Sequence, residues 1–195
     1  VELGLYRTAV FAAREVLNLA GMSDAGTLTA PTYFSRIRFG AYFSEIVLPE
    51  TASEDIDPLF FYAMMRQESL FEGFVTSSAG ARGLMQITPD TGQQAATLSG
   101  WPPDFTADDL YRPLVSIRLG ADYLAVQRHA YGGDLYAALA AYNAGPGAAS
   151  YWFGQAKGDP DLFLEIIDFP ETHNHIQSIY ELFVIYRNLY SVEAE

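Results

Sequence analysis

A single acidic residue interrupts an apolar stretch near the middle of the chain. Glu68 lies in "LFFYAMMRQESLF", and a helical reading places it in one stripe with Phe60, Met64 and Phe71. An acid on an apolar face is costly unless it reaches water or has a function. Burial favours the neutral form of a carboxylic acid, and a protonated acid in an apolar cleft is what a general acid for glycoside cleavage requires. The alternative is a carboxylate that caps the helix, pairs with a nearby arginine or points to solvent.

A second candidate segment is "SSAGARGLMQIT", residues 77–88. Gly80 and Gly83 permit a tight turn and a close approach of the backbone to its neighbours. Gln86 offers a donor and an acceptor for sugar hydroxyl or amide groups, and Met85 offers an adaptable apolar wall. The alternative is a helix start that packs on the core.

The third candidate segment is "AAYNAGPG", residues 140–147. Tyr142 and Asn143 end a helix of small residues, just before a glycine-rich break. We expect the break to leave both side chains at the edge of a cleft. The alternative is a tyrosine in the core followed by an asparagine in a C-terminal turn.

Frequent helix signals and the near absence of alternating strand patterns predict an all-α architecture. Asp or Thr followed by Pro marks helix starts at Pro58, Pro89 and Pro160, and Asp134 is a further candidate cap. The expected helices cover about 2–20, 32–47, 58 to the Glu68 region, 89–100, 113–131, 135–144, a short one from 146, a brief one from 160, and 171–190. A Gly-, Ser- and Thr-rich stretch at 21–32 and an acidic connector at 48–58 separate the first three.

The composition excludes several functional classes. The chain has 195 residues, half of them apolar, with 11 Lys and Arg against 24 Asp and Glu, for a net charge of −13. This surface disfavours nucleic acid and anionic lipid, and no apolar run is long enough for a membrane span. The absence of cysteine excludes disulfides and thiol catalysis. The chain starts at Val1 without a leader pattern, so we expect a mature protein or an excised piece.

The order of the motifs "RQES", "GLMQ", "AYNAGPG" and "ET" resembles the catalytic domain of the soluble lytic transglycosylases. The resemblance covers about residues 57–190. It implies an almost entirely helical member of the α+β lysozyme-like superfamily, with extra N-terminal helices. Residues 1–56 resemble the last helices of the α-superhelical region that precedes this domain in large members of the family. The expected division is therefore 1–56 and 57–195.

The resemblance assigns roles to particular residues. Glu68 matches the single catalytic acid/base, which would cleave the bond between N-acetylmuramic acid and N-acetylglucosamine of peptidoglycan and form a 1,6-anhydromuramyl end. The substrate's N-acetyl group is expected to assist. Tyr142 is expected to hydrogen-bond Glu68 and orient it. The other expected saccharide-groove residues are Ser77, Ser78, Met85, Gln86, Asn143 and Glu171. No cofactor and no metal are expected, and the location is expected to be extracytoplasmic.

The chain departs from the family pattern at two places. The pair Glu72-Gly73 stands where the family often has Asn-Pro, and we expect Glu72 to lie in solvent. His173 and His175 replace the Arg and Tyr of an "ETR.Y" pattern, and we expect them at the surface or the cleft rim rather than on a metal. The strong negative charge is unusual for an enzyme that acts on an anionic wall polymer.

Two alternative functions remain open from the sequence. A hydrolase similar to goose-type lysozyme would also use one glutamate, but it would yield a reducing end in place of the anhydro end. A glycan-binding or assembly module without catalysis would share the fold, yet it would have no need of an acid on an apolar face.

Overall fold

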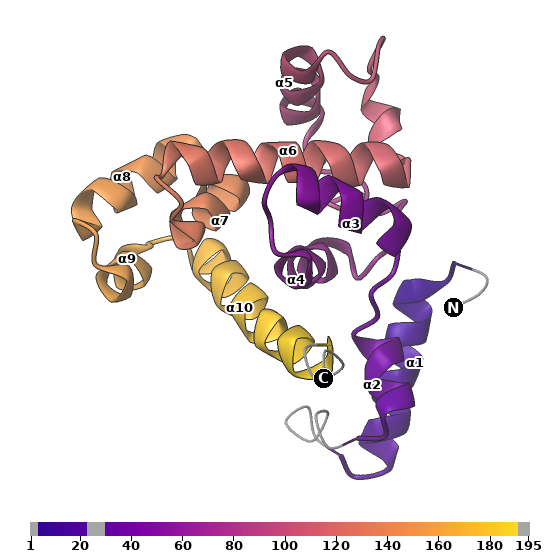
Figure 1. Cartoon of the computed structure of the whole chain (residues 1–195). Coiled ribbons are helices and arrows are strands. Elements are labelled where there is room, and N and C mark those ends of the chain that lie inside the picture. Colours follow the sequence, from indigo (N-terminus) through magenta and orange to yellow (C-terminus); the bar gives the residue numbers. More distant parts are fainter. Residues whose placement is uncertain (1–3, 23–29, 191–195) are drawn as a thin grey trace.

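The computed structural model describes residues 4–22 and 30–190, and within these ranges helices make up most of the chain (Figure 1). The helices are α1 (Tyr6–Leu19), α2 (Thr32–Arg38), α3 (Ser44–Ser53), α4 (Pro58–Ser69), α5 (Pro89–Ser99), the 3-10 helix η2 (Ala107–Tyr111), α6 (Pro113–Ala130), α7 (Leu135–Ala144), α8 (Pro146–Ala156), α9 (Pro160–Ile166) and α10 (Pro170–Tyr190). Only isolated β-bridges, such as that between Thr76 and Arg82, occur in the described part. The all-α prediction is therefore confirmed there, while most of the stretch predicted at 21–32 lies outside the described residues.

The predicted helix starts are confirmed where a polar residue precedes the helix. Each capping side chain accepts a hydrogen bond from a backbone N–H group of the first turn, which would otherwise lack a partner. These caps are Asp57 on α4, Thr88 on α5, Asp134 on α7 and Asp159 on α9. Three of the four helices have proline as their first residue, where the missing N–H group costs nothing.

The single helix predicted at 32–47 is wrong, because the chain forms α2 and α3 with a turn between them. Phe39 in this turn is buried, and its carbonyl accepts a hydrogen bond from the Tyr190 hydroxyl at 2.8 Å. The carbonyl of Gly40 accepts one from Tyr186 at 3.2 Å. Contacts with the distant helix α10 thus replace the hydrogen bonds that would continue the helix.

The connector predicted at 48–58 is also partly helical, since α3 continues to Ser53 with Pro49 inside it. Val47 and Thr51 are buried on the side that faces α4 and α6. The Thr51 hydroxyl donates to the Val47 carbonyl at 2.7 Å. Packing therefore outweighs the polar composition of this stretch.

Helix α4 is the centre of the core and is buried on all sides between Phe60 and Met65. It packs along α10, and α3 covers another of its faces (Figure 1). Helix α7 contacts α6, α8 and α10, and its run of buried small residues from Ala137 to Ala141 permits this close approach. Because α4 ends at Ser69, the acid Glu68 lies in its last turn, where the helix leaves the core.

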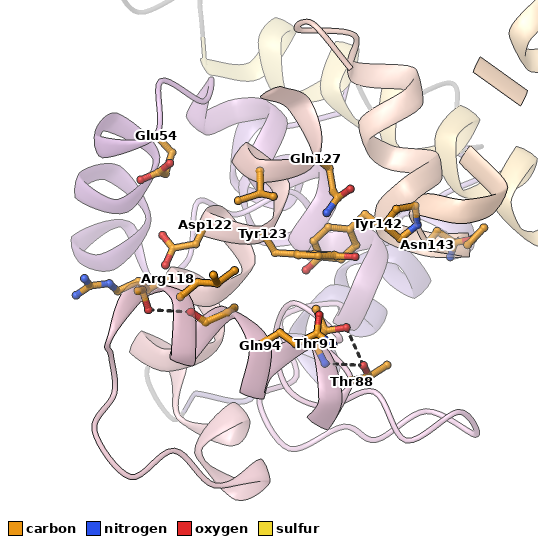
Figure 2. Close-up of a pocket in the computed structure, with 17 residues that line it drawn as sticks. Glu54, Thr88, Thr91, Gln94, Arg118, Asp122, Tyr123, Gln127, Tyr142 and Asn143 are labelled. Carbon is orange, nitrogen blue, oxygen red and sulfur yellow. Dashed lines mark hydrogen bonds between the residues drawn. The ribbon is translucent and has the colours of Figure 1, made fainter. Parts of the chain in front are cut away.

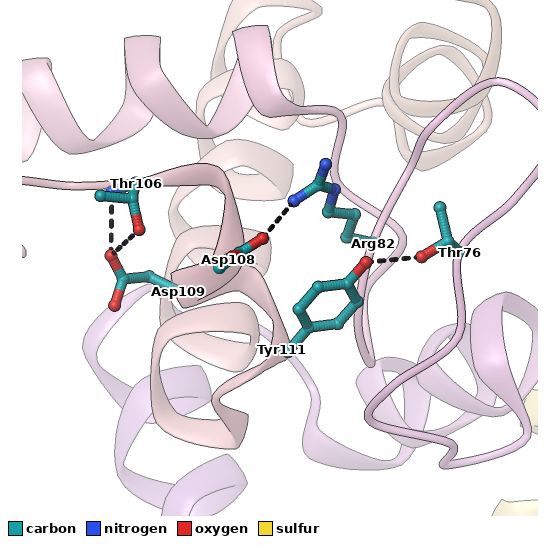
Figure 3. Close-up of polar contacts among 6 residues, drawn as sticks. All are labelled: Thr76, Arg82, Thr106, Asp108, Asp109 and Tyr111. Atoms are coloured by element: carbon teal, nitrogen blue, oxygen red, sulfur yellow. Dashed lines mark hydrogen bonds and ion pairs between the residues drawn. The ribbon is translucent and has the colours of Figure 1, made fainter.

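The loop between α4 and α5 is held by η2 (Figure 3). The Arg82 guanidinium pairs with Asp108 at 2.7 Å and lies over the ring of Tyr111. The Tyr111 hydroxyl is 2.6 Å from the hydroxyl of Thr76. Within the loop, the Gly83 N–H group donates to the Val75 carbonyl at 3.0 Å. The loop that carries the predicted saccharide-binding residues is thus held by η2 and by its own backbone.

Candidate active site

Glu68 lies where α4 meets the start of α10. Its side chain is 12% exposed, and its Oε1 is 2.7 Å from Nε2 of His175, whose side chain is 6% exposed. No hydrogen bond from the described residues reaches the other carboxyl oxygen, Oε2. The acid is thus held on one oxygen and neither escapes to bulk water nor pairs with an arginine.

The carboxyl group opens into a cleft of about 490 Å³ formed by α4, the following loop, the end of α7 and the start of α10. Six of the predicted site residues line it, and they are Glu68, Ser77, Gln86, Tyr142, Asn143 and Glu171. Ser78 is exposed and does not line this cleft. Met85 is fully buried, so its side chain does not form the apolar wall expected of it. The structure therefore brings residues from three distant segments of the chain to one place.

The predicted hydrogen bond between Tyr142 and Glu68 is wrong. The Tyr142 hydroxyl instead donates to the backbone carbonyl of Met85 at 2.8 Å. Met85 is fixed further by its N–H group, which donates to the hydroxyl of Ser116 at 3.1 Å. Burial, followed by the nearby Glu68 charge, raises the pKa of Tyr142 well above its usual range, so the phenol stays a donor. Tyr142 thus fixes the loop next to Glu68 rather than Glu68 itself.

This geometry predicts the effect of Tyr142→Phe. The Met85 carbonyl would lose its partner, and we expect a loss of about 1–2 kcal/mol in the free energy of unfolding. Because the hydroxyl does not hold Glu68, we expect turnover to stay within about tenfold of the wild-type rate. Urea unfolding and the rate of peptidoglycan solubilisation measure the two effects. A thousandfold loss of turnover with unchanged stability would instead place the hydroxyl in the reaction.

Gln86 has a strained backbone at the cleft wall. Its φ is +48°, in the left-handed region that residues other than glycine seldom adopt. The side-chain amide nitrogen donates to the carbonyl of Gly83 at 2.9 Å and to that of Val75 at 3.3 Å. Both donors are used within the loop, which leaves the amide oxygen available to a ligand.

Asn143 joins α7 to α10 beside the cleft. Its Oδ1 accepts a hydrogen bond from the hydroxyl of Thr172 at 2.7 Å. The neighbouring Glu171 is exposed and lines the cleft. The bond fixes the first turn of α10, and the next turn presents His175 to Glu68.

Sequence reasoning missed the role of His175. We expected both substituted histidines at the surface or the rim, but His175 is buried against Glu68, whereas His173 is partly exposed. One signal was available, since Glu171 and His175 are four residues apart and therefore share a face of the helix. The missed lining residues are Gln67, Ala79, Ala81, Thr88, Asn174 and His175.

Glu72 does not belong to the helix that carries Glu68. Helix α4 ends at Ser69, and Leu70 and Phe71 turn the chain with φ values of +50° and +63°. The Glu72 carboxylate accepts a weak bond from the backbone of Phe74 at 3.5 Å in an exposed setting. It therefore lies outside the cleft, on the solvent side as expected.

A second cavity of about 900 Å³ adjoins the cleft and shares Thr88, Tyr142 and Asn143 with it (Figure 2). Figure 2 shows Tyr142 and Asn143 at one end and the charged side chains of Arg118 and Asp122 at the other. We call these two adjoining cavities the groove, and Glu68 lines the smaller of them.

Asp122 gives this groove a pH-dependent feature. Burial, reinforced by Glu54 and opposed by Arg118, raises the pKa of Asp122 to about 6. The folded protein therefore binds a proton more tightly here than the unfolded chain does, and the stability contribution of this group falls as pH rises from about 4 to about 6.

Asp122→Asn should remove this effect. We expect the variant to be more stable than the wild type by about 1 kcal/mol at pH 7, after allowance for a half-exposed side chain, and equally stable near pH 4. Melting temperatures across this pH range provide the test. An equal gain at pH 4 and pH 7 would show that ionisation of Asp122 is not the cause.

Two properties of the described residues bear on other kinds of site. They contain no group of three or more His, Asp or Glu side chains arranged to hold a metal ion. Even the 21-residue helix α10 lacks an apolar stretch sufficient to span a lipid bilayer, and the same holds for the other described helices.

Comparisons with known proteins identify the family of this chain. The family model described as "Transglycosylase SLT domain" matches residues 46–162. The soluble lytic murein transglycosylase of Salmonella typhimurium is 33% identical over 153 residues, which are 77% of this chain and 24% of that protein. The corresponding protein of Escherichia coli K12 is 32% identical over 152 residues, again 77% of this chain and 24% of that protein. The chain thus spans about a quarter of these relatives' length.

Solved structures show the same relationship. The 70 kDa soluble lytic transglycosylase of Escherichia coli superposes with a TM-score of 0.77 at 29% identity, covering 97% of this chain and 30% of that chain. An inactive mutant of lytic transglycosylase Slt from Pseudomonas aeruginosa superposes with a TM-score of 0.72 at 30% identity, covering 93% of this chain and 30% of that chain. The family match covers more than half of the sequence, and the fold and motif order agree with it. The chain therefore belongs to the transglycosylase SLT domain family.

Proposed function

We propose that this chain is a peptidoglycan lytic transglycosylase that cleaves the β-1,4 bond between N-acetylmuramic acid and N-acetylglucosamine. The observation that carries the proposal is the position of Glu68. It is a mostly buried carboxyl group, held through Oε1, on the wall of a groove made of two adjoining cavities of about 490 and 900 Å³. The names of the relatives, which are lytic murein transglycosylases, supply the substrate class.

In the proposed reaction, Glu68 acts twice. As an acid it gives its proton to the glycosidic oxygen while the bond from that oxygen to C1 of the muramyl residue breaks. As a carboxylate it then takes the proton of the muramyl 6-hydroxyl while that oxygen bonds to C1. The proton balance closes, no water is consumed, and the muramyl residue leaves as a 1,6-anhydro sugar. The substrate's own N-acetyl group would support the positive charge at C1, as the family resemblance implies.

Other cleft residues would position the glycan. The amide oxygen of Gln86 and the carboxylate of Glu171 are acceptors for sugar hydroxyl and N-acetyl N–H groups. Ser77 and Asn143 line the same cleft and offer further hydrogen bonds. Tyr142 would act indirectly, because its hydroxyl fixes the Met85 carbonyl beside the cleft.

We further propose that the catalytic domain covers residues 57–195 and that 1–56 is the end of an α-superhelical region. Helices α1 and α2 pack against each other, and the matched part of this chain covers only 24% of each of these relatives. Helix α3 packs on α4 and α6, and the family match starts at residue 46, so α3 would act as the connection between the two parts. Its peptidoglycan substrate would place the protein outside the cytoplasm.

The proposal is tested by digesting purified peptidoglycan with this protein and measuring the masses of the released muropeptides by mass spectrometry. A lytic transglycosylase releases anhydromuramyl ends, and a hydrolase releases reducing ends that are heavier by one water. Binding to peptidoglycan with no release of fragments would indicate a glycan-binding module. Only the first outcome agrees with the proposed function.

A further inference from the structure

Glu68 is paired with a buried histidine through one of its two carboxyl oxygens. His175 lies on α10, one turn after Glu171, and its Nε2 is 2.7 Å from Oε1 of Glu68. At this distance one proton lies between the two atoms. The question is which of the two groups donates it, because a histidine nitrogen can donate or accept.

The second ring nitrogen decides between the alternatives. Nδ1 of His175 is buried, and within residues 4–22 and 30–190 it has no hydrogen-bond partner. If Nε2 accepted a proton from Glu68, Nδ1 would carry a hydrogen with no acceptor. A ring protonated on both nitrogens would also leave the Nδ1–H group without an acceptor, and it would add a buried positive charge. Buried N–H groups that lack an acceptor are rarer in proteins than buried acceptors that lack a donor. The environment of Nδ1 therefore favours a neutral ring that carries its hydrogen on Nε2.

We propose that His175 is a positioning residue whose Nε2–H group donates to Oε1 of Glu68 and leaves Oε2 to carry the catalytic proton. This inference rests on the proposed function only for the identity of the reaction. The tautomer itself is a property of the free protein.

The arrangement serves both halves of the reaction without rearrangement. When Glu68 is the acid, its proton is on Oε2 and Oε1 is a carbonyl oxygen that accepts from His175. When Glu68 is the carboxylate, the same hydrogen bond remains and becomes stronger, because its acceptor is now charged. His175 neither gains nor loses a proton, and only Oε2 exchanges one with the sugar oxygens. The histidine thus fixes the direction in which the acid points.

The first test reads the tautomer directly. The chain has three histidines, so long-range proton–nitrogen NMR spectra of a nitrogen-15-labelled sample resolve each ring. His175→Gln assigns the ring of interest by the loss of its signals. We expect the nitrogen shifts of a neutral ring protonated on Nε2 and bare on Nδ1, at the pH at which the enzyme is active. A ring protonated on Nδ1, or on both nitrogens, would overturn the proposal. The NMR measurement gives this result whether or not the protein is catalytically active.

The second test separates positioning from simple packing. His175→Leu fills the site but cannot donate, whereas His175→Gln places an amide N–H group near the position of Nε2. We expect the leucine variant to lose about a hundredfold in kcat with KM nearly unchanged, and the glutamine variant to stay within about tenfold of the wild-type kcat. The matched control is His173→Leu on the same helix, which should leave kcat unchanged. Equal losses in the leucine and glutamine variants would contradict a role for the donated hydrogen bond.

The experiments distinguish a failure of the proposed function from a failure of the proposed role of His175. If the wild type released no product, the proposed function would be wrong, while the NMR reading of His175 would still support or overturn the tautomer. If anhydro products formed but the ring carried its proton on Nδ1, the function would stand and the positioning role would be lost.

Discussion

Glu68→Gln is expected to reduce the release of muropeptides by a factor of roughly 10²–10⁴, the range typical for loss of a general acid and base. Glutamine has the same shape as the acid, and its amide oxygen can still accept the hydrogen bond from His175. It has no acidic proton to give to the glycosidic oxygen and cannot take one from the 6-hydroxyl. Both steps assigned to Glu68 should therefore fail together.

Binding should survive the same change. The groove keeps its shape, so we expect the Glu68→Gln protein to sediment with insoluble peptidoglycan as the wild type does. Glu72→Gln is the matched control, since it is the same chemical change in the adjoining loop, outside the cleft, and should leave turnover unaffected. Full activity in Glu68→Gln would show that another group is the acid.

Gly83→Ala is expected to destabilise the protein by more than about 3 kcal/mol. Gly83 has a φ of +74°, and an added Cβ would lie 1.9 Å from the backbone carbonyl oxygen of Leu110 and 3.0 Å from the hydroxyl oxygen of Ser116. A backbone carbonyl cannot rotate away as a long side chain can. The loop would have to leave η2 and α6, and the cleft residues Ser77 and Gln86 would move with it.

Gly80→Ala provides the comparison, because only the backbone conformation opposes it. Gly80 has a φ of +81°, but an added Cβ meets no heavy atom within 4 Å. We expect a loss of about 1 kcal/mol, as is usual for alanine in a left-handed position. Urea unfolding of the two variants and of the wild type gives both values. Equal losses would show that close packing against Leu110 is not what requires glycine at position 83.

Most of the helices from Pro58 onward could be predicted because their signals are local. The capping residues Asp57, Thr88 and Asp134 precede their helices directly, and each acts within its own first turn. The helix predicted at 32–47 failed because its interruption depends on the hydroxyl groups of Tyr186 and Tyr190, which lie far away in the sequence. No local pattern contains that information.

The same distinction applies to the site. The position of Glu68 at a cleft followed from one acid in an apolar stripe and from the order of the motifs. The hydrogen-bond partners of the site side chains could not be predicted in this way. Tyr142 bonds a carbonyl 57 positions earlier in the chain, and His175 contacts Glu68 across 107 positions. Met85 was predicted to form a groove wall from its residue type alone, but its burial depends on how the loop packs over α6. Residue type gave the chemistry, and tertiary packing decided which atoms meet.

The central claim is that Glu68 catalyses formation of an anhydro sugar without water. The most direct test is to digest purified peptidoglycan in water enriched in oxygen-18 and to measure the masses of the released muropeptides by mass spectrometry. Because the 6-hydroxyl of the muramyl residue replaces water in the proposed reaction, we expect anhydromuramyl ends that contain no heavy oxygen, and none of them from Glu68→Gln. Reducing ends that carry one heavy oxygen would contradict the account and show that the groove around Glu68 performs hydrolysis.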